Sequence, residues 1–157
     1  MEKRLLLDAN LAILVAVGLT DRAFIGRHKR LATYDEADFD IVSGMIGRSS
    51  GILFTPNVLS ETSNLARYVS DPMRSQICVI LAEIIARSEE CYISSSDAAK
   101  HPAYLRLGLT DAALLVAAEQ NATLLTDDLN LYLAVESAGL SPINYNHLRE
   151  LRGDFRN

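Results

Sequence analysis

The stretch R-L-L-L-D-A-N-L-A-I-L-V-A-V-G, residues 4–18, decides the fold of this 157-residue chain. A short apolar run ends at Asp8, and a second apolar run from Leu11 to Val17 continues without a break until Gly18. The first run fits a buried strand and the second a buried helix closed by a glycine, although periodicity alone does not separate the two. We therefore predict a strand over 4–7 and a helix over 11–17, with an acidic residue at their junction.

The same alternation of short apolar runs and helical segments continues to the end of the chain. The predicted strands lie at 52–54, 91–93, 122–125 and 142–145. The predicted helices cover 34–46, 55–69, a segment from Asp71-Pro72 through Ile85, 110–120 with Thr110 as cap, and 129–137. Residues 20–34 are expected to form a polar connection, and 94–96 a loop that leads into a short turn.

Strands that alternate with helices through short connections favour a mostly parallel sheet covered on both sides. The sequence therefore predicts an α/β fold with three layers, α/β/α. No internal repeat, low-complexity tract or Pro/Gly-rich linker interrupts the chain. We expect a single domain over residues 1–157.

Composition excludes several classes of protein. Hydrophobic residues make up 49% of the chain and charged residues 22%, which excludes a disordered chain. Cys78 and Cys91 lack a C-x-x-C motif and a nearby histidine, which excludes a zinc site and favours a reduced cytoplasmic compartment. No run approaches the roughly 18 apolar residues of a membrane helix, and Asp8 and Asn10 interrupt a start that faintly resembles a signal peptide. We expect a soluble cytoplasmic protein with no membrane partner.

Acidic residues follow two of the predicted strands. Asp8 comes directly after the first strand, and Asp127 and Asp128 follow the strand 122–125 with only Thr126 between. Because the carboxyl ends of parallel strands meet at one edge of a sheet, where ligands bind, these acids are expected to lie together. Taken singly, Asp8 or Asp128 is also a typical helix N-cap.

Two further acids are expected on the inner faces of helices. Glu61 interrupts an apolar stripe on its predicted helix, and Asp111 shares a helix face with Leu114 and Leu115. The alternatives are that Glu61 reaches water at the rim of the stripe and that Asp111 is a first-turn residue favoured by the helix dipole. No Lys or Arg lies close to these acids in sequence. A gathering of such carboxylates needs a compensating cation, and the hard divalent ions Mg²⁺ and Mn²⁺ prefer oxygen ligands.

Four short motifs resemble, in order, the acidic motifs of the PIN-domain family. They are L-L-L-D-A-N at 5–10, P-N-V-L-S-E at 56–61, L-T-D-A-A-L at 109–114 and L-L-T-D-D at 124–128. The resemblance covers nearly the whole chain and implies a PIN-like fold. It departs from the compact toxins of that family at 20–50, where this chain is longer and contains R-H-K-R.

The resemblance also implies roles for individual residues. It implies catalytic roles for Asp8, Glu61, Asp111 and Asp128, a metal site made of these four acids and Asp127, and orienting hydrogen bonds from Asn10 and Thr126. Separately, the basic residues of the polar connection form a candidate RNA-binding arm, with a solvated loop as the alternative. They are Arg22, Arg27, Lys29 and Arg30.

The net charge fits this assignment. The chain has 15 basic and 20 acidic residues, a formal net charge of −5, which at first counts against a nucleic-acid ligand. Without the five candidate site acids, the acidic residues fall from 20 to 15 and equal the 15 basic ones. The excess of negative charge is therefore accounted for by the cleft that divalent ions would neutralise.

The implied activity is that of a ribonuclease dependent on Mg²⁺ or Mn²⁺ that hydrolyses RNA phosphodiester bonds. The resemblance implies a VapC-type toxin that forms a homodimer and is silenced by an antitoxin protein. The alternatives are a PIN-family nuclease without an antitoxin, acting in RNA processing or defence, and a non-catalytic PIN-like binding module. A phosphatase of the haloacid-dehalogenase type is a further alternative, but its chemistry requires D-x-D, and Asn10 stands at the second position.

Overall fold

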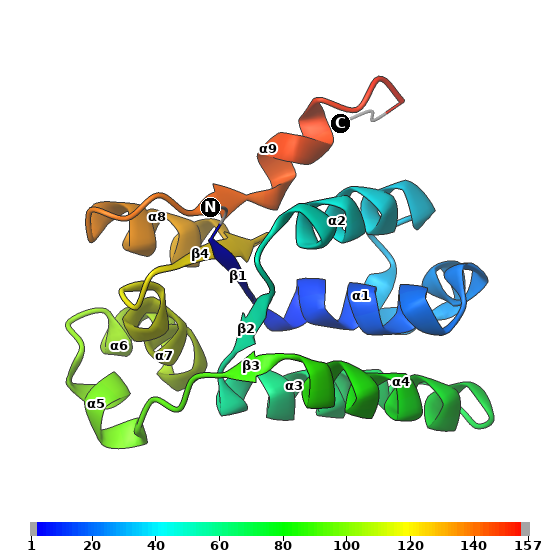
Figure 1. The fold of residues 1–157 in the computed structure, drawn as a ribbon, viewed down its shortest axis with the longest axis horizontal. Helices are drawn as coiled ribbons and strands as arrows, with labels where there is room; N and C mark the ends of the chain where they lie inside the picture. The colour runs from blue at the N-terminus through cyan, green and yellow to red at the C-terminus, as the bar shows by residue number, and fades with distance from the viewer. Residues whose placement is uncertain (1–2, 155–157) are drawn as a thin grey trace.

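A five-stranded, all-parallel sheet forms the centre of residues 3–154, the part of the chain that the computed structural model describes (Figure 1). The strand order is β3-β2-β1-β4-β5. The strands are β1 (Arg4–Leu7), β2 (Ile52–Phe54), β3 (Glu89–Glu90), β4 (Ala122–Thr126) and β5 (Ile143–Asn144). The predicted three-layer α/β/α fold with a parallel sheet is confirmed. The expectation of one domain over 1–157 includes residues 1–2 and 155–157, which lie outside the described residues.

Helices cover both sides of the sheet. In Figure 1, α1 to α4 gather on one side and α5 to α8 on the other. The α-helices are α1 (Ala9–Thr20), α2 (Glu36–Arg48), α3 (Pro56–Ala66), α4 (Met73–Arg87), α5 (Ser95–Lys100), α6 (Tyr104–Leu107), α7 (Leu109–Ala118), α8 (Leu129–Ser137) and α9 (Tyr145–Glu150). Two 3₁₀ turns, η1 (Arg22–Arg27) and η2 (Lys29–Leu31), connect α1 to α2. No helix within residues 3–154 combines the length and apolar character needed to cross a membrane.

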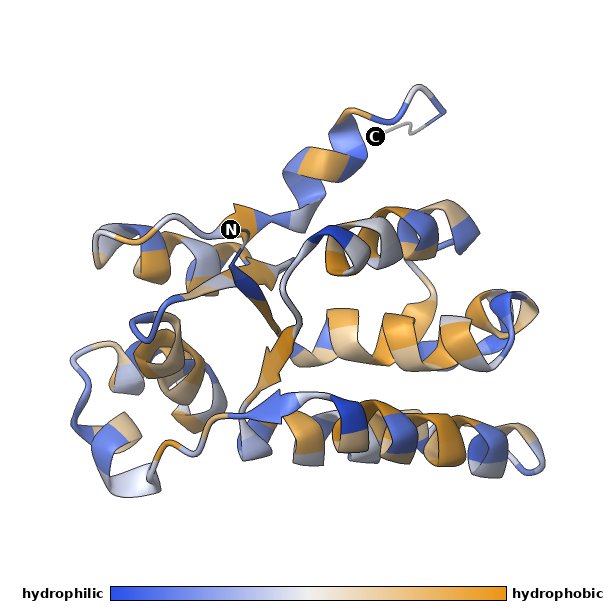
Figure 2. Cartoon of the chain, in the orientation of Figure 1, coloured by the Kyte–Doolittle hydropathy of each residue, from blue (hydrophilic) through white to orange (hydrophobic). Residues whose placement is uncertain are grey.

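Helix α1 is buried along almost its whole length, and Figure 2 colours most of it as hydrophobic. It continues past Gly18 to Thr20, so the predicted end at Gly18 is wrong. Gly18 has a packing role instead, because a Cβ there would overlap the ring of Phe39 on α2. The absence of a side chain at Gly18 therefore lets α2 approach α1 closely.

Several element boundaries differ from those predicted. Residues 20–34 form η1 and η2 with Ile25 and Leu31 fully buried, so this segment is more than a polar connection. Helix α3 ends at Ala66, short of the predicted 69. Helix α2 runs through Gly47 to Arg48, and strand β3 lies at 89–90, where the prediction was 91–93.

The start of α7 and the segment after β5 also correct the sequence-based assignment. Gly108 occupies the N-cap of α7 with a φ of +84°, so Thr110 lies in the first turn and is not the cap. A residue with a side chain adopts this φ only with strain, which explains the glycine. The predicted strand 142–145 is only two residues long and is followed directly by α9.

Candidate functional site

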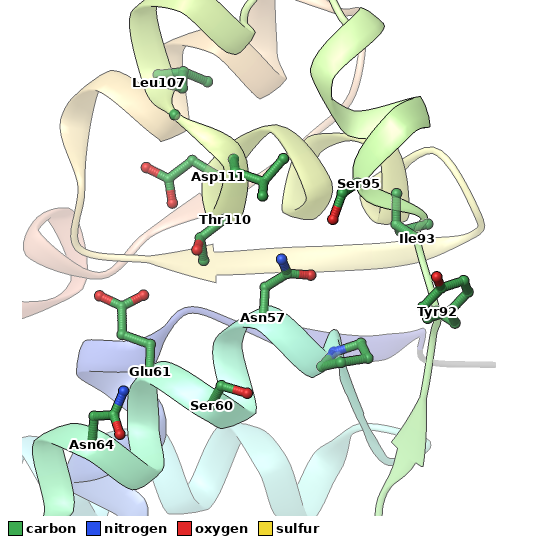
Figure 3. Close-up of a pocket in the computed structure, with 13 residues that line it drawn as sticks. Asn57, Ser60, Glu61, Asn64, Tyr92, Ile93, Ser95, Leu107, Thr110 and Asp111 are labelled. Carbon is green, nitrogen blue, oxygen red and sulfur yellow. The ribbon is translucent and has the colours of Figure 1, made fainter.

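A polar cleft of about 720 Å³ opens between α3 and the first turn of α7, and residues 92–95, which lead into α5, line a third side. Glu61 comes from α3, and Thr110 and Asp111 come from α7. Figure 3 shows the carboxyl groups of Glu61 and Asp111 facing each other from these two walls, with Thr110 close by. The cleft is therefore lined on two sides by acids that are 50 residues apart in the sequence.

Glu61 is exposed and faces this cleft, so its predicted burial in an apolar stripe is wrong. The residues that form the buried face of α3 lie to one side of Glu61. The prediction also placed Val69 on this apolar stripe, but Val69 lies beyond the end of the helix. The buried residues of α3 are Val58, Leu59, Thr62, Leu65 and Ala66. Glu61 thus reaches the cleft at the border of the apolar face.

Asp111 is half-buried, and its carboxyl group lies within the electrostatic reach of two other acids. Burial, and after it the charges of Asp128 and Glu61, raise the pKa of Asp111 to about 6. Asp128 itself is exposed at the N-cap of α8, where its Oδ1 accepts the Leu131 N–H at 3.0 Å. Asp128 therefore serves as a helix cap and also contributes negative charge to the cleft.

Thr126 connects Asp128, which lies near Asp111 and Glu61, with Asp8 at the end of β1. Its Oγ1 accepts the Asp128 N–H at 3.0 Å, and its hydroxyl donates to Oδ2 of Asp8. Parallel pairing of Leu7 with Leu125 in β1 and β4 brings these residues side by side. The acids that follow β1 and β4 are thus joined through the buried Thr126, as their positions at the strand ends predict.

Asp8 is the most deeply buried of the candidate acids, with 7% of the residue exposed. Its Oδ2 also accepts the Asp127 N–H at 3.2 Å, and its Oδ1 accepts the Leu11 N–H at 3.1 Å as the N-cap of α1. Burial, and after it the charge of Asp127, raise the pKa of Asp8 to about 8, although these hydrogen bonds oppose the shift. Within the described chain, no basic residue contributes to the pKa shift of either Asp8 or Asp111.

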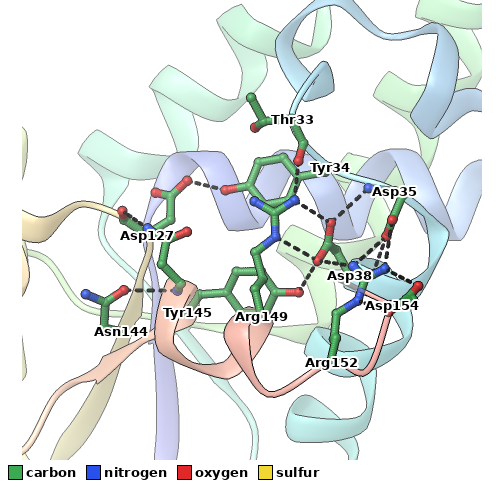
Figure 4. A network of polar contacts seen from close by, with 11 residues as sticks. Thr33, Tyr34, Asp35, Asp38, Asp127, Asn144, Tyr145, Arg149, Arg152 and Asp154 are labelled. Carbon is green, nitrogen blue, oxygen red and sulfur yellow. Dashed lines mark hydrogen bonds and ion pairs between the residues drawn. The ribbon is translucent and has the colours of Figure 1, made fainter. Parts of the chain in front are cut away.

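Asp127 is held by residues from three parts of the chain. Nδ2 of Asn10 lies 3.2 and 3.3 Å from its two carboxylate oxygens, and the hydroxyl of Tyr34 donates to Oδ2 (Figure 4). Asn146 on α9 donates to the Asp127 carbonyl at 2.9 Å. The sequence analysis did not single out Tyr34 or Asn146, because no local pattern links either residue to Asp127.

A network around Asp38 extends from this group to α9 (Figure 4). The guanidinium of Arg149 lies over the Tyr34 ring, 5.2 Å from its centre, and its Nε lies 3.1 Å from Oδ1 of Asp38. Asp38 is fully buried and also accepts from the Tyr145 hydroxyl at 2.6 Å and from Nη1 of Arg152 at 2.8 Å. Helix α9 is thereby fixed next to the residues that hold Asp127.

The acids fit a hard divalent cation in their chemistry but do not form a closed cage. All are oxygen donors, and the raised pKa values of Asp8 and Asp111 show that neighbouring acids and burial disfavour their charged forms. Nevertheless, in residues 3–154 no three His, Cys, Asp or Glu side chains are close enough together to form a ready-made metal site. The site contains two adjoining groups of carboxylates, one around Asp8 and one around Asp111.

The four basic residues of the predicted RNA-binding arm differ in their surroundings. Arg22 forms ion pairs with Asp40 and Glu36, so its charge is compensated. The guanidinium of Arg30 lies over the ring of Tyr68. Arg27 and Lys29 line a second pocket, at the other end of α3 from the acidic cleft.

Comparison with known proteins gives no family assignment: no protein-family model and no curated protein matches the chain.

Proposed function

We propose that the chain is a ribonuclease dependent on Mg²⁺ or Mn²⁺, with a PIN-like acidic centre, that hydrolyses RNA phosphodiester bonds. The observation that carries this proposal is the meeting of acids from β1, β4, α3 and α7 at one edge of the sheet, without a basic residue that compensates Asp8 or Asp111. The resemblance of the four acidic motifs to the PIN-domain family supports the same activity.

The ligands of the proposed centre are Asp8, Glu61, Asp111, Asp127 and Asp128. A divalent ion bound by them would lower the pKa of a water molecule and offset the charge of the leaving oxygen. Thr126 and the Leu11 N–H fix the orientation of Asp8, and Asn10 and Tyr34 fix that of Asp127.

The substitution Asp8→Asn tests this function. It keeps the size of the side chain and removes the carboxylate that the proposed ion would bind, so we expect a folded protein whose Mn²⁺-dependent cleavage of RNA is at least about 100-fold slower. Asp40→Asn, which removes an exposed partner of Arg22, is the control and should leave the rate unchanged. Cleavage at the wild-type rate by a folded Asp8→Asn protein would refute the assignment of Asp8.

We also propose the more specific role of a cytoplasmic toxin that forms a homodimer and is paired with an antitoxin. The acidic cleft supports it, because a cationic side chain of a partner peptide would complement the charges of Glu61 and Asp111. Expression of the wild type should arrest growth, expression of Asp8→Asn should not, and co-expression of a small antitoxin should restore growth. If the wild type cleaves RNA in vitro but causes no arrest, the nuclease without antitoxin becomes the better proposal.

A non-catalytic PIN-like binding module is the second candidate. The observation that favours it is that residues 3–154 contain no ready-made group of three metal-binding side chains. This candidate predicts that RNA is bound in the presence of Mn²⁺ but is recovered intact. Isothermal titration of the wild type with Mn²⁺, followed by incubation with labelled RNA, separates the two proposals.

A further inference from the structure

The exposed side of α3 connects the acidic cleft with a pocket of opposite charge. We define the α3 track as the half-buried or exposed polar residues on this side, which recur with helical spacing and continue one turn past the helix. They are Asn57, Ser60, Glu61, Asn64, Arg67 and Tyr68. Glu61 is the only acid of this track, and it lies in the acidic cleft.

The basic pocket, at the C-terminal end of α3, has a volume of about 570 Å³. Its lining includes Arg27 and Lys29 from η1 and η2, Arg67 from the end of α3, and Arg74 from α4. The single acid of the lining, Asp71, lies 2.8 Å from Arg74. Arg27, Lys29 and Arg67 therefore concentrate positive charge on a chain whose net charge is −5.

The fold itself places these basic residues together. His28 is only 2% exposed, its Nδ1 accepts the Arg30 N–H at 3.2 Å, and its ring lies near the Ala66 carbonyl, although Nε2 has no partner in hydrogen-bond geometry. The neighbouring Ile25 and Leu31 are fully buried. The segment of η1 and η2 is thus held in place by three buried side chains, and the His28 ring lies at the end of α3.

An aromatic ring stands next to this charge. Tyr68 is 55% exposed, and the guanidinium of Arg30 lies 5.7 Å from the centre of its ring. Exposed aromatic rings flanked by cations bind unpaired bases by stacking, whereas bases in a duplex already stack on one another. This combination favours a single strand as the ligand.

The distance between the two ends of the track suits a polynucleotide. Glu61 and Arg67 are six residues apart, which corresponds to about 9 Å along α3. That distance is the length of roughly three nucleotides in a stacked strand. Asn64 lies between them and Ser60 lies next to Glu61, and amide and hydroxyl groups of this kind are typical hydrogen-bond partners of phosphate and sugar.

We propose that the α3 track and the basic pocket form the binding path of a single-stranded RNA that extends from the acidic cleft. Its phosphates pair with Arg27, Lys29 and Arg67, and one unpaired base stacks on Tyr68. This inference rests on the proposed function in one respect, namely that the acidic cleft is the site of cleavage. The path itself is tested by binding alone.

The test measures binding of a fluorescein-labelled 12-nucleotide oligo-U RNA by anisotropy, in EDTA, at several salt concentrations. For the variant Arg27→Ala/Lys29→Ala/Arg67→Ala we expect at least about a tenfold weaker Kd and a slope of log K against log salt that is smaller by about 2. The variant Arg48→Ala/Arg87→Ala/Arg106→Ala removes the same charge from exposed positions outside the basic pocket and should change the Kd less than twofold. An equal loss of RNA affinity in the two triple variants would overturn the proposal.

Tyr68 provides a second measurement that leaves the charge unchanged. Tyr68→Ala should weaken binding of the same RNA by about fivefold or more, and Tyr68→Phe should bind as the wild type does, because only the ring is needed for stacking. A blunt RNA duplex that binds as tightly as oligo-U would overturn the single-strand assignment. Poly-glutamate that binds with the same affinity and salt dependence would reassign the pocket to an acidic protein partner and also overturn it.

The two proposals fail in different ways. If Asp8→Asn abolishes cleavage while the triple variant of the basic pocket binds oligo-U normally, the nuclease stands and the path is wrong. If oligo-U binding depends on the pocket and on Tyr68 but the wild type cleaves nothing, the path stands and the proposed reaction is wrong.

Discussion

At the scale of single residues, Tyr34 controls the orientation of Asp127. It is buried, its hydroxyl donates to Oδ2 of Asp127, and its ring packs against the guanidinium of Arg149. Burial, and after it the charge of Asp127, raise the pKa of Tyr34 above its usual value near 10, so the hydroxyl keeps its proton and remains a donor near neutral pH. Tyr34 is therefore a positioning residue for the proposed centre.

The substitution Tyr34→Phe should slow cleavage several-fold and leave the Kd for RNA unchanged, because it releases Asp127 without altering the basic pocket. Loss of one buried hydrogen bond should lower the free energy of unfolding by about 1 kcal/mol. Single-turnover cleavage and urea unfolding measure the two effects. Tyr132→Phe, which removes an exposed hydroxyl bonded to Glu136, is the matched control. An unchanged single-turnover rate in Tyr34→Phe would show that this hydrogen bond does not position Asp127 for the reaction.

At the scale of the elements, the close approach of α1 and α2 depends on Gly18. The ring of Phe39 lies where a side chain at Gly18 would be. We expect Gly18→Ala to lower the free energy of unfolding by about 1–3 kcal/mol, because the added methyl group forces Phe39 or the helix to move. Thermal or urea unfolding measures the change.

Gly47 is the control for this prediction. It also lies in a helix, α2, and a Cβ there would meet nothing within 4 Å. Gly47→Ala should therefore be neutral or stabilise by up to about 1 kcal/mol, as expected from the helix propensities of the two residues. If both substitutions have the same effect, the close packing of Phe39 is not what requires a glycine at position 18.

The elements also show what the sequence could predict. The apolar runs at 4–7 and 122–125 correctly predict β1 and most of β4, and the positions of Asp8 and Asp128 at strand ends agree with their capping of α1 and α8. These features are local. The contact of Tyr34 with Asp127 spans 93 positions and depends on how α2 packs, so no local pattern indicates it.

Glu61 shows a different limit of sequence analysis. Its spacing from Val58 and Leu65 suggests a shared face, but a residue at the border of an apolar stripe can point either way. The packing of α3 buries Thr62 and leaves Glu61 exposed in the cleft. The periodicity was therefore misleading about the burial of Glu61.

At the scale of the whole molecule, the gathered acids make stability depend on pH. The pKa of Asp8 is raised from 3.8 in the unfolded chain to about 8, and that of Asp111 to about 6. The folded protein therefore binds more protons than the unfolded chain between about pH 4 and pH 8, and its stability falls as the pH rises through this range. The titration of Asp8 lowers the free energy of unfolding by at most about 5 kcal/mol over this pH range.

We expect thermal unfolding in EDTA to show a decreasing melting temperature from pH 5 to pH 8, and a weaker decrease in Asp8→Asn. A millimolar concentration of Mn²⁺ should raise the melting temperature of the wild type at pH 8 more than that of Asp8→Asn, because a bound cation favours the charged carboxylates. A wild-type profile in EDTA that is flat or rises over this range would contradict the unusual pKa of Asp8.

The hydrogen bond between Asp8 and Thr126 joins positions that are 118 residues apart. During synthesis, β1 and the helix that Asp8 caps leave the ribosome long before their partner strand β4 exists. At translation rates of roughly 5–20 residues per second, the interval is at least about 6 seconds. A nascent chain therefore carries an incomplete centre through most of its synthesis. Under the proposed function, the protein could not attack the messenger that encodes it until that messenger has been read almost to the end of the region described here.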